Sequence, residues 1–214
     1  MLRQLGDPSM TAHALSNLGR TMQSLGEYRK AEQLLQESLE LSREHGYRFA
    51  TGLALNGLGK LAHAEGRYEE VQLFFSESAS LFREMGDTHR LSRTLNHRGL
   101  NSLALNQVVE AQHDSNFALS LAYKGGFTSS ALNALTGLAM LEAQQKASQG
   151  TLEQVLYVLQ HPASLQETRD RAARLRAELE SQLTRQQVEA AQARAQGRPF
   201  EVVVDEILKQ AELT

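Results

Sequence analysis

The feature that most constrains this chain is a repeat of forty residues, marked by glycines. These glycines are Gly6, Gly46, Gly86 and Gly126. A fixed period of twenty to fifty residues indicates a stack of similar units instead of a single central core. We therefore expect four units, at residues 7–45, 46–85, 86–125 and 126–160, followed by a non-repeating segment at 161–214.

Each unit has the pattern of two helices joined by a turn. In the first unit, two apolar stripes with three- and four-residue spacing lie on either side of Gly26. The stripes are Ala14, Leu15, Leu18, Met22 and Leu25, then Tyr28, Ala31, Leu34, Leu35, Leu39 and Leu41. We expect the first helix of the unit, helix A, to end near Leu25 and helix B to follow. Asp7 before Pro8 is a typical helix start, and the period-marking glycines suit the left-handed turn that ends a helix.

Three further glycines recur inside the predicted A helices, at Gly19, Gly59 and Gly99. Glycine lowers helix stability by about 1 kcal/mol relative to alanine. We interpret these positions as notches at which the neighbouring helix B approaches closely, since one hairpin cannot bury both of its faces.

The composition supports an all-α fold and excludes several function classes. Aromatic residues make up 6% of the chain, and there are no cysteines, so disulfides and thiolate chemistry are excluded. The net charge of −3 provides no overall basic field for nucleic acid. Neither a secretion signal nor an apolar run of membrane-spanning length is present, and we expect a cytoplasmic location without membrane contact.

The repeated strings resemble the tetratricopeptide repeat. The resemblance is carried by Ala14-Leu15-Ser16-Asn17-Leu18-Gly19, by Leu25-Gly26-Glu27-Tyr28, and by Leu55-Asn56-Gly57-Leu58-Gly59 with Gly66-Arg67-Tyr68. The forty-residue period is similar to that of kinesin light chains, spindle-orientation adaptors and maltotriose-responsive bacterial activators. The resemblance implies a right-handed superhelical array of antiparallel helix hairpins that binds other proteins.

The beginning of the chain has the pattern of the end of a preceding repeat helix, over residues 1–6. The C-terminal segment resembles the end of the repeat regions in large bacterial signalling proteins. We therefore expect a sensor module of a larger signalling or regulatory protein, with an effector domain attached at its N-terminal side.

The later units depart from the repeat. Asn106 replaces the turn glycine of the third unit, and Lys146 replaces that of the fourth, where we expect helix B to start at Thr151 after an extended turn. Beyond residue 160, Ser164 and Thr184 each begin the pattern of a capping box. Pro199 opens a last helix, although its Val202–Val204 run alone is also compatible with a strand. Its apolar positions at helical spacing are Phe200, Val203, Val204, Ile207, Leu208 and Ala211.

Catalytic and metal-binding patterns are not found. Gly57-Leu58-Gly59-Lys60 lacks the remaining residues of a phosphate loop, and the seven histidines form no His-Glu-x-x-His motif. We predict neither an enzyme nor a cofactor nor a metal. The arginines after Ser164 alternate with acids, and the pairs Glu167 with Arg171 and Asp170 with Arg174 indicate a self-paired surface instead of a nucleic-acid site.

The resemblance implies that helix A lines the concave side of the array, so its polar residues are the candidate groove. They are His13, Ser16, Asn17, Arg20 and Gln23 in the first unit, Asn56, Lys60 and His63 in the second, Arg93, Asn96 and Leu100 in the third, and Asn133, Thr136 and Met140 in the fourth. Asparagines can bond both polar groups of a peptide backbone, and the cations favour an acidic segment. The plainer interpretation is that these residues only solvate an exposed surface.

Three functions are compatible with these observations. The preferred one is a non-catalytic module that binds a protein or peptide in the groove. The second is a free-standing adaptor or homo-oligomeric scaffold that associates through its first hairpin. The third is a small-ligand sensor of a transcription activator, which the scarcity of aromatic groove residues disfavours for sugars.

Overall fold

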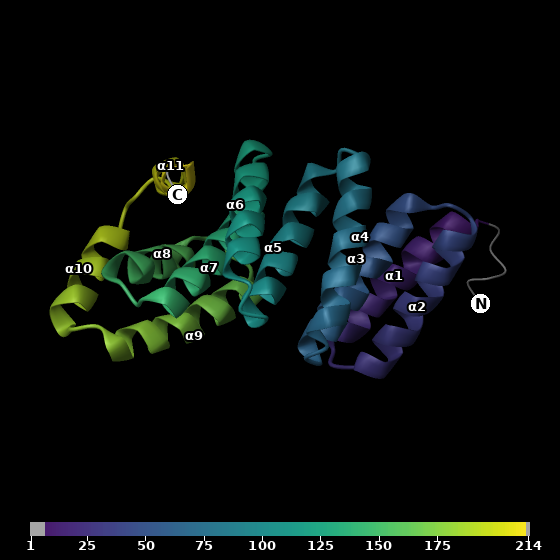
Figure 1. Ribbon diagram of the computed structural model, residues 1–214, viewed down its shortest axis with the longest axis horizontal. Helices are drawn as coiled ribbons and strands as arrows, with labels where there is room; N and C mark the ends of the chain where they lie inside the picture. The colour runs from purple at the N-terminus through teal and green to yellow at the C-terminus, as the bar shows by residue number, and fades with distance from the viewer. Residues whose placement is uncertain (1–6, 213–214) are drawn as a thin grey trace. The chain divides into compact units, whose positions relative to one another are not determined.

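The computed structural model of the protein describes residues 7–212, and within them all regular structure is α-helical, in eleven helices (Figure 1). The expected end of a preceding repeat helix at residues 1–6 lies outside the described residues. The helices are α1 Pro8–Ser24, α2 Tyr28–Glu44, α3 Arg48–Ala64, α4 Tyr68–Glu84, α5 Thr88–Ala104, α6 Val108–Lys124, α7 Thr128–Gln145, α8 Gln149–Gln160, α9 Gln166–Gln182, α10 Arg185–Ala195 and α11 Phe200–Glu212. The Val202–Val204 run is therefore helical, as predicted.

A left-handed residue at the end of each helix sets a spacing of twenty residues between the starts of α1 to α7. The residues with positive φ are Gly26 (79°), Gly46 (69°), Gly66 (76°), Gly86 (69°), Asn106 (58°) and Gly126 (71°). Asn106 takes the same conformation as the glycines because its short polar side chain tolerates this region best among the other residues. The series ends at Lys146, where the backbone is extended with φ of −165°.

The chain forms two compact units, divided between Leu105 and Asn106, inside the third predicted repeat. Unit 1 contains α1 to α5, in which α1 pairs with α2, α3 with α4, and each hairpin packs on the next helix. Leu35 and Leu39 of α2 form a buried core with Ala54, Leu55 and Leu58 of α3. These sequential hairpins are the architecture of an α-solenoid of the tetratricopeptide type.

Two of the predicted notch glycines, Gly19 and Gly59, lie against helix B, as predicted. A Cβ atom at Gly19 would come within 2.7 Å of Leu35 Cγ, and one at Gly59 within 2.7 Å of Phe75 Cε1. Both distances are shorter than a normal contact between carbon atoms. The absence of a side chain therefore allows α2 and α4 to approach their A helices closely.

The predicted stripe of α1 is partly wrong. Leu18 and Leu25 are 40% and 68% exposed, while Ser16 is fully buried and its Oγ lies 2.7 Å from Ser38 Oγ. The Ser38 hydroxyl donates to the carbonyl of Ala12 at 2.6 Å. Small polar residues thus tie α1 to α2, because a buried hydroxyl with a backbone acceptor permits close helix packing without an unmet hydrogen bond.

Unit 2 contains α6 to α11 and is less regular. In it, α6 packs on α7, α8 contacts α7, α9 and α10, and α11 packs chiefly on α6. Helix α8 begins at Gln149, two residues before the predicted start, with the Ser148 hydroxyl as its cap. The predicted box at Ser164 is wrong, since its Oγ donates to the Val158 carbonyl instead. The capping box of Thr184 with Gln187 is confirmed.

Candidate functional site

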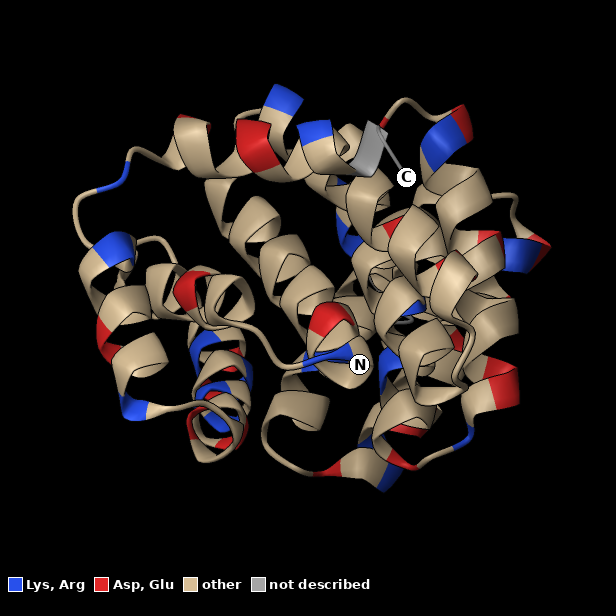
Figure 2. Ribbon diagram, turned by 60° about the vertical axis from the view of Figure 1, so that its left-hand side comes forward, with Lys and Arg blue, Asp and Glu red and all other residues tan. Residues whose placement is uncertain are grey.

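The two kinds of helix in unit 1 differ in their acidic residues; Figure 2 colours Lys and Arg blue and Asp and Glu red on the ribbon. The A helices α1, α3 and α5 contain no Asp or Glu; their cations are Arg20, Arg48, Lys60, Arg90, Arg93 and Arg98. The B helices α2 and α4 carry the acids, which are Glu32, Glu37, Glu40, Glu44, Glu69, Glu70, Glu77 and Glu84. The side chains of the A helices in this unit therefore present positive charge only.

Three arginines of the A helices lie close enough to affect one another. The pKa of Arg20 on α1 is lowered by burial and by the nearby charges of Arg93 and Arg90 on α5. Arg90 pairs with Asp87 at 2.8 Å, whereas Arg20 and Arg93 form no ion pair with any residue that the structure describes. Two cations that repel each other without a counter-ion favour the arrival of an anion.

A cavity of about 280 Å³ opens beside Arg20. Its lining residues come from α1 and α3, and they are Asn17, Arg20, Thr21, Gln23, Ser24 and Lys60. Four of these were predicted groove residues, so the structure brings part of that set together. We call Arg20, Lys60, Arg90 and Arg93 the basic face of unit 1.

An aromatic ring lies at the same side of unit 1 as Arg90. The guanidinium of Arg90 is 4.6 Å from the ring centroid of Phe49, and His13 meets that ring edge-on at 5.6 Å. These contacts hold the Arg90 side chain over α3. Neither Phe49 nor Arg90 was among the predicted groove residues, although both stand near the start of an A helix that lacks acids.

Several predicted groove residues have a structural role instead. Asn56 donates to Thr94 Oγ1 at 2.8 Å and thereby joins α3 to α5. His63 Nδ1 lies 3.4 Å from Asn101 Oδ1, and its ring packs edge-on against Tyr68. In unit 2, Asn133 Oδ1 accepts a 2.8 Å hydrogen bond from Arg171 of α9.

Three predicted residues are not accessible, and this corrects the expectation that they line an open groove. Ser16 is fully buried, and Asn96 and Thr136 are each only 1% exposed. Thr136 donates to the Leu132 carbonyl, and both amide atoms of Asn96 are without a hydrogen-bond partner. A helix in the middle of a stack is covered on several sides, so a polar residue there can be buried. Leu100 and Met140 are half-buried.

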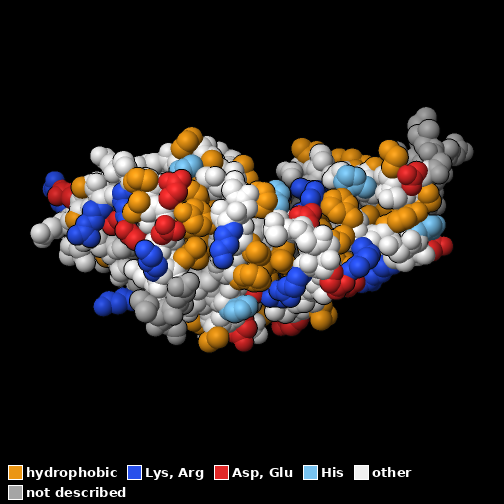
Figure 3. Space-filling view, turned by 90° about the horizontal axis from the view of Figure 1, so that it is seen from above, with side chains coloured by type: hydrophobic (Ala, Val, Ile, Leu, Met, Phe, Trp, Pro, Cys, Tyr) orange, Lys and Arg blue, Asp and Glu red, His pale blue; other side chains and the backbone are white. Residues whose placement is uncertain are grey.

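Other predicted features can be located within residues 7–212. Arg171 pairs with Glu167 at 3.1 Å, as predicted, whereas Asp170 accepts from Gln166. No group of metal-ligating side chains is found there, and no described helix is both long and apolar enough to cross a membrane. On the side shown in Figure 3, cations are dispersed among acidic and apolar side chains.

Comparison with protein families matches residues 10–84 to the tetratricopeptide repeat. The match covers most of the first two hairpins, where the glycine notches and the B-helix tyrosines recur. It gives no support to the expected likeness to bacterial signalling sensors. A search of the curated proteins found no match.

Proposed function

We propose, from the tetratricopeptide match of residues 10–84 and the basic face beside them, that unit 1 recognises an acidic segment of a partner protein. Tetratricopeptide domains are generally protein-interaction modules, and the proposal specifies the surface and the charge of the ligand. It concerns binding without catalysis.

The observation that carries the proposal is the unpaired state of Arg20 and Arg93. Several other arginines of unit 1 are paired with nearby acids, among them Arg43 with Glu77 at 2.6 Å and Arg67 with Glu32 at 3.0 Å. Cations left without acids on one surface, in a unit that has enough acids to pair them, favour a negatively charged ligand.

The cavity beside Arg20 adds hydrogen-bonding groups to this charge. Asn17 and Gln23 can each donate to and accept from a peptide backbone, while the arginine fork suits a carboxylate. An acidic side chain placed between Arg20 and Arg93 would relieve their repulsion. A stacked array also changes pitch through small shifts at each interface, so a segment that prefers one pitch would serve a regulatory role.

The test uses a fluorescent ten-residue peptide of alternating Glu and Ser, together with its Gln counterpart. We expect the Glu peptide to bind more tightly, and the double substitution Arg20→Ala with Arg93→Ala to weaken it by roughly tenfold or more. Fluorescence anisotropy at low and moderate salt measures both effects.

The matched control removes the same number of charges from the B helices of unit 1. Arg29→Ala with Arg83→Ala lowers the net charge equally, so it should change the affinity by less than about twofold if the site is local. Equal weakening by the two double variants, or equal binding of the Gln peptide, would contradict the proposal.

A further inference from the structure

Helix α11 lies in a groove of unit 2 whose sides are α6 and α8. Phe200 packs edge-on against Tyr123 of α6, with ring centroids 6.0 Å apart, and it also contacts His161 at the end of α8. Ile207 lines one cavity with Leu138 of α7 and another with Tyr157 of α8. The helix therefore covers α7 between its two neighbours.

The contact residues of α11 follow the spacing of an amphipathic helix bound in a groove. Phe200, Val203, Val204 and Ile207 stand at positions i, i+3, i+4 and i+7. Val203, Val204 and Ile207 are buried, whereas Val202 is 43% exposed. This is the pattern by which separate amphipathic helices bind to a groove on another protein.

Two cavities lie beside α11 in its groove. A cavity of about 250 Å³ separates it from α8 and α10, and one of about 170 Å³ lies where it faces α6 and α7. Both cavities open to solvent, so α11 is flanked by clefts where it faces α8 and α10 and where it faces α6 and α7.

The lining of the groove is partly polar. The side-chain oxygen of Gln154 is shielded from solvent and has no hydrogen-bond partner while α11 is in place. Asn116 and Gln112 line the smaller cavity. Departure of α11 would let water reach the Gln154 oxygen, which lowers the free energy of opening relative to exposing a purely apolar core.

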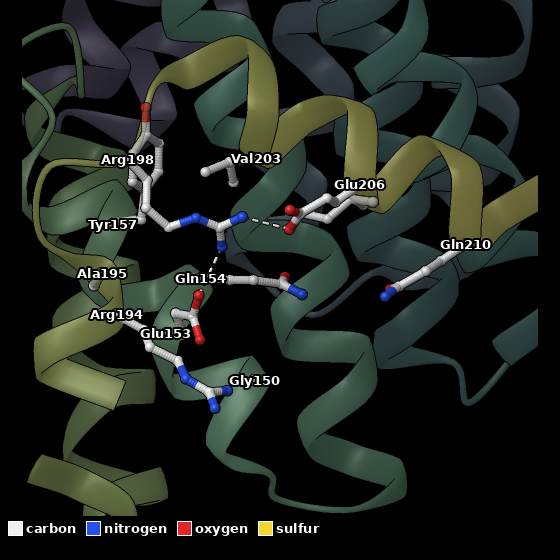
Figure 4. Close-up of a pocket in the computed structure, with 11 residues that line it drawn as sticks. Gly150, Glu153, Gln154, Tyr157, Arg194, Ala195, Arg198, Val203, Glu206 and Gln210 are labelled. Atoms are coloured by element: carbon white, nitrogen blue, oxygen red, sulfur yellow. Dashed lines mark hydrogen bonds and ion pairs between the residues drawn. The ribbon is translucent and has the colours of Figure 1, made fainter. Parts of the chain in front are cut away.

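Arg198 anchors the loop that precedes α11 (Figure 4). Its guanidinium bonds Glu153 Oε1 of α8 at 2.6 Å and also contacts Glu206 of α11. The side chain of Glu153 is 13% exposed and that of Glu206 is 55% exposed. The pair between Arg198 and Glu153 can persist when α11 leaves. Arg198 would then offer the N–H groups that contact Glu206 to another carboxylate.

From these observations we infer that the groove between α6 and α8 is a docking site for an amphipathic helix of a partner protein, which binds in exchange with α11. The partner helix carries four apolar residues in the spacing of Phe200, Val203, Val204 and Ile207, and an acid at the position of Glu206. This site is separate from the basic face of unit 1, and its test does not depend on that proposal.

The test uses the full chain and a fluorescent synthetic peptide with the sequence of residues 198–212. In the unaltered chain, α11 competes with the peptide and reduces its apparent affinity. Ile207→Asp in the chain displaces α11 from the groove. We expect the peptide to bind this variant at least tenfold more tightly than it binds the unaltered chain. A peptide that carries the same substitution should not bind.

The matched control is Val202→Asp in the chain, which places the same charge on the exposed side of α11. We expect peptide affinity equal to that of the unaltered chain. Three results would overturn the inference: a folded Ile207→Asp chain that does not bind the peptide, a Val202→Asp chain that binds it as tightly as the Ile207→Asp chain does, or loss of helix content throughout unit 2 in the Ile207→Asp chain. The last result would show that α11 is an integral part of the core.

Discussion

Neighbouring B helices are joined differently in the two units. In unit 1, Phe74 and Leu81 of α4 pack directly on the core that α2 and α3 form, and Arg43–Glu77 links α2 to α4. In unit 2, a separate helix, α11, lies between α6 and α8, with cavities on both sides. A regular repeat allows each hairpin to bury the side of its neighbour. Where the repeat becomes irregular, as in unit 2, another segment must cover the exposed side of the hairpin. Such a segment can be one that exchanges with another helix.

The largest effect expected from this difference concerns buried apolar residues in the two settings. Phe75 of α4 is 1% exposed and stacks on His97 of α5, so Phe75→Ala should lower the free energy of unfolding by about 3–5 kcal/mol. Ile207→Ala should release α11 alone and shift the main thermal transition much less. Circular dichroism melts of both variants provide the measurement.

Leu73→Ala is the control for Phe75→Ala, because Leu73 lies on the same helix and is 73% exposed. Its effect should stay within about 0.5 kcal/mol. If Ile207→Ala lowered the temperature of the main thermal transition as far as Phe75→Ala does, the distinction between a shared core and a separately packed helix would be wrong.

A smaller effect is expected at the two ion-pair centres. Arg67 of unit 1 contacts Glu32, Glu65 and Glu70, and Arg198 of unit 2 contacts Glu153 and Glu206. Arg198→Ala should raise amide exchange in α11 by roughly fivefold, about 1 kcal/mol, because its contacts with Glu153 and Glu206 join that end of the helix to α8. Arg67→Ala should change exchange in α4 by less than about twofold, since the apolar core retains it. Hydrogen-exchange mass spectrometry measures both, and equal responses would remove the distinction.

The turn at the boundary of the units allows a still smaller test. Asn106 has a left-handed φ of 58°, which glycine adopts with less strain, so Asn106→Gly should raise the free energy of unfolding by about 0.5–1 kcal/mol. Lys146 occupies the corresponding position of the next repeat, but its φ is −165°. Lys146→Gly should therefore give no gain in chemical denaturation. A gain at Lys146 or none at Asn106 would show that backbone strain does not set these turns.

The sequence predicts the helices well because their ends have local causes. Gly26 and Gly66 mark turns, Thr184 caps α10, and Gly19 and Gly59 mark close packing, each through a property of that residue alone. The apolar period predicts less about exposure: Leu18 is exposed and Ser16 is buried, since burial depends on which neighbouring helix is present.

The candidate site was predicted only in part, for the same physical reason. Asn17, Arg20, Gln23 and Lys60 surround one cavity, whereas Asn56 bonds α5 and Asn96 is buried. A polar residue of an A helix can face a ligand or an adjoining helix, and helical spacing alone does not distinguish them. The lack of acids on α1, α3 and α5 is visible in the sequence and is the more informative signal for the basic face.

The smallest expected effect links ligand binding in unit 1 to pH. The pKa of His89 is lowered by burial and by Arg93 and Arg90, which outweigh the opposing charge of Asp87. A carboxylate bound at the basic face would offset those arginines and raise the pKa of His89, so binding takes up a proton. Affinity for the Glu peptide should therefore increase by roughly two- to threefold between pH 8 and pH 6, above the range in which the ligand carboxylates titrate.

Substitution of His89 determines whether this histidine is the coupled group. His89→Gln should flatten the pH profile of peptide binding, while His113→Gln, on α6 of unit 2, should leave it unchanged. An affinity that decreases from pH 8 to pH 6, or a pH profile unaffected by His89→Gln, would show that the ligand does not approach the arginines of α5. In unit 2, His161 contacts Phe200 of α11 and its pKa is lowered by burial. An increase in Glu-peptide affinity that depends on His89 therefore separates acidic-segment binding from helix docking in the same chain.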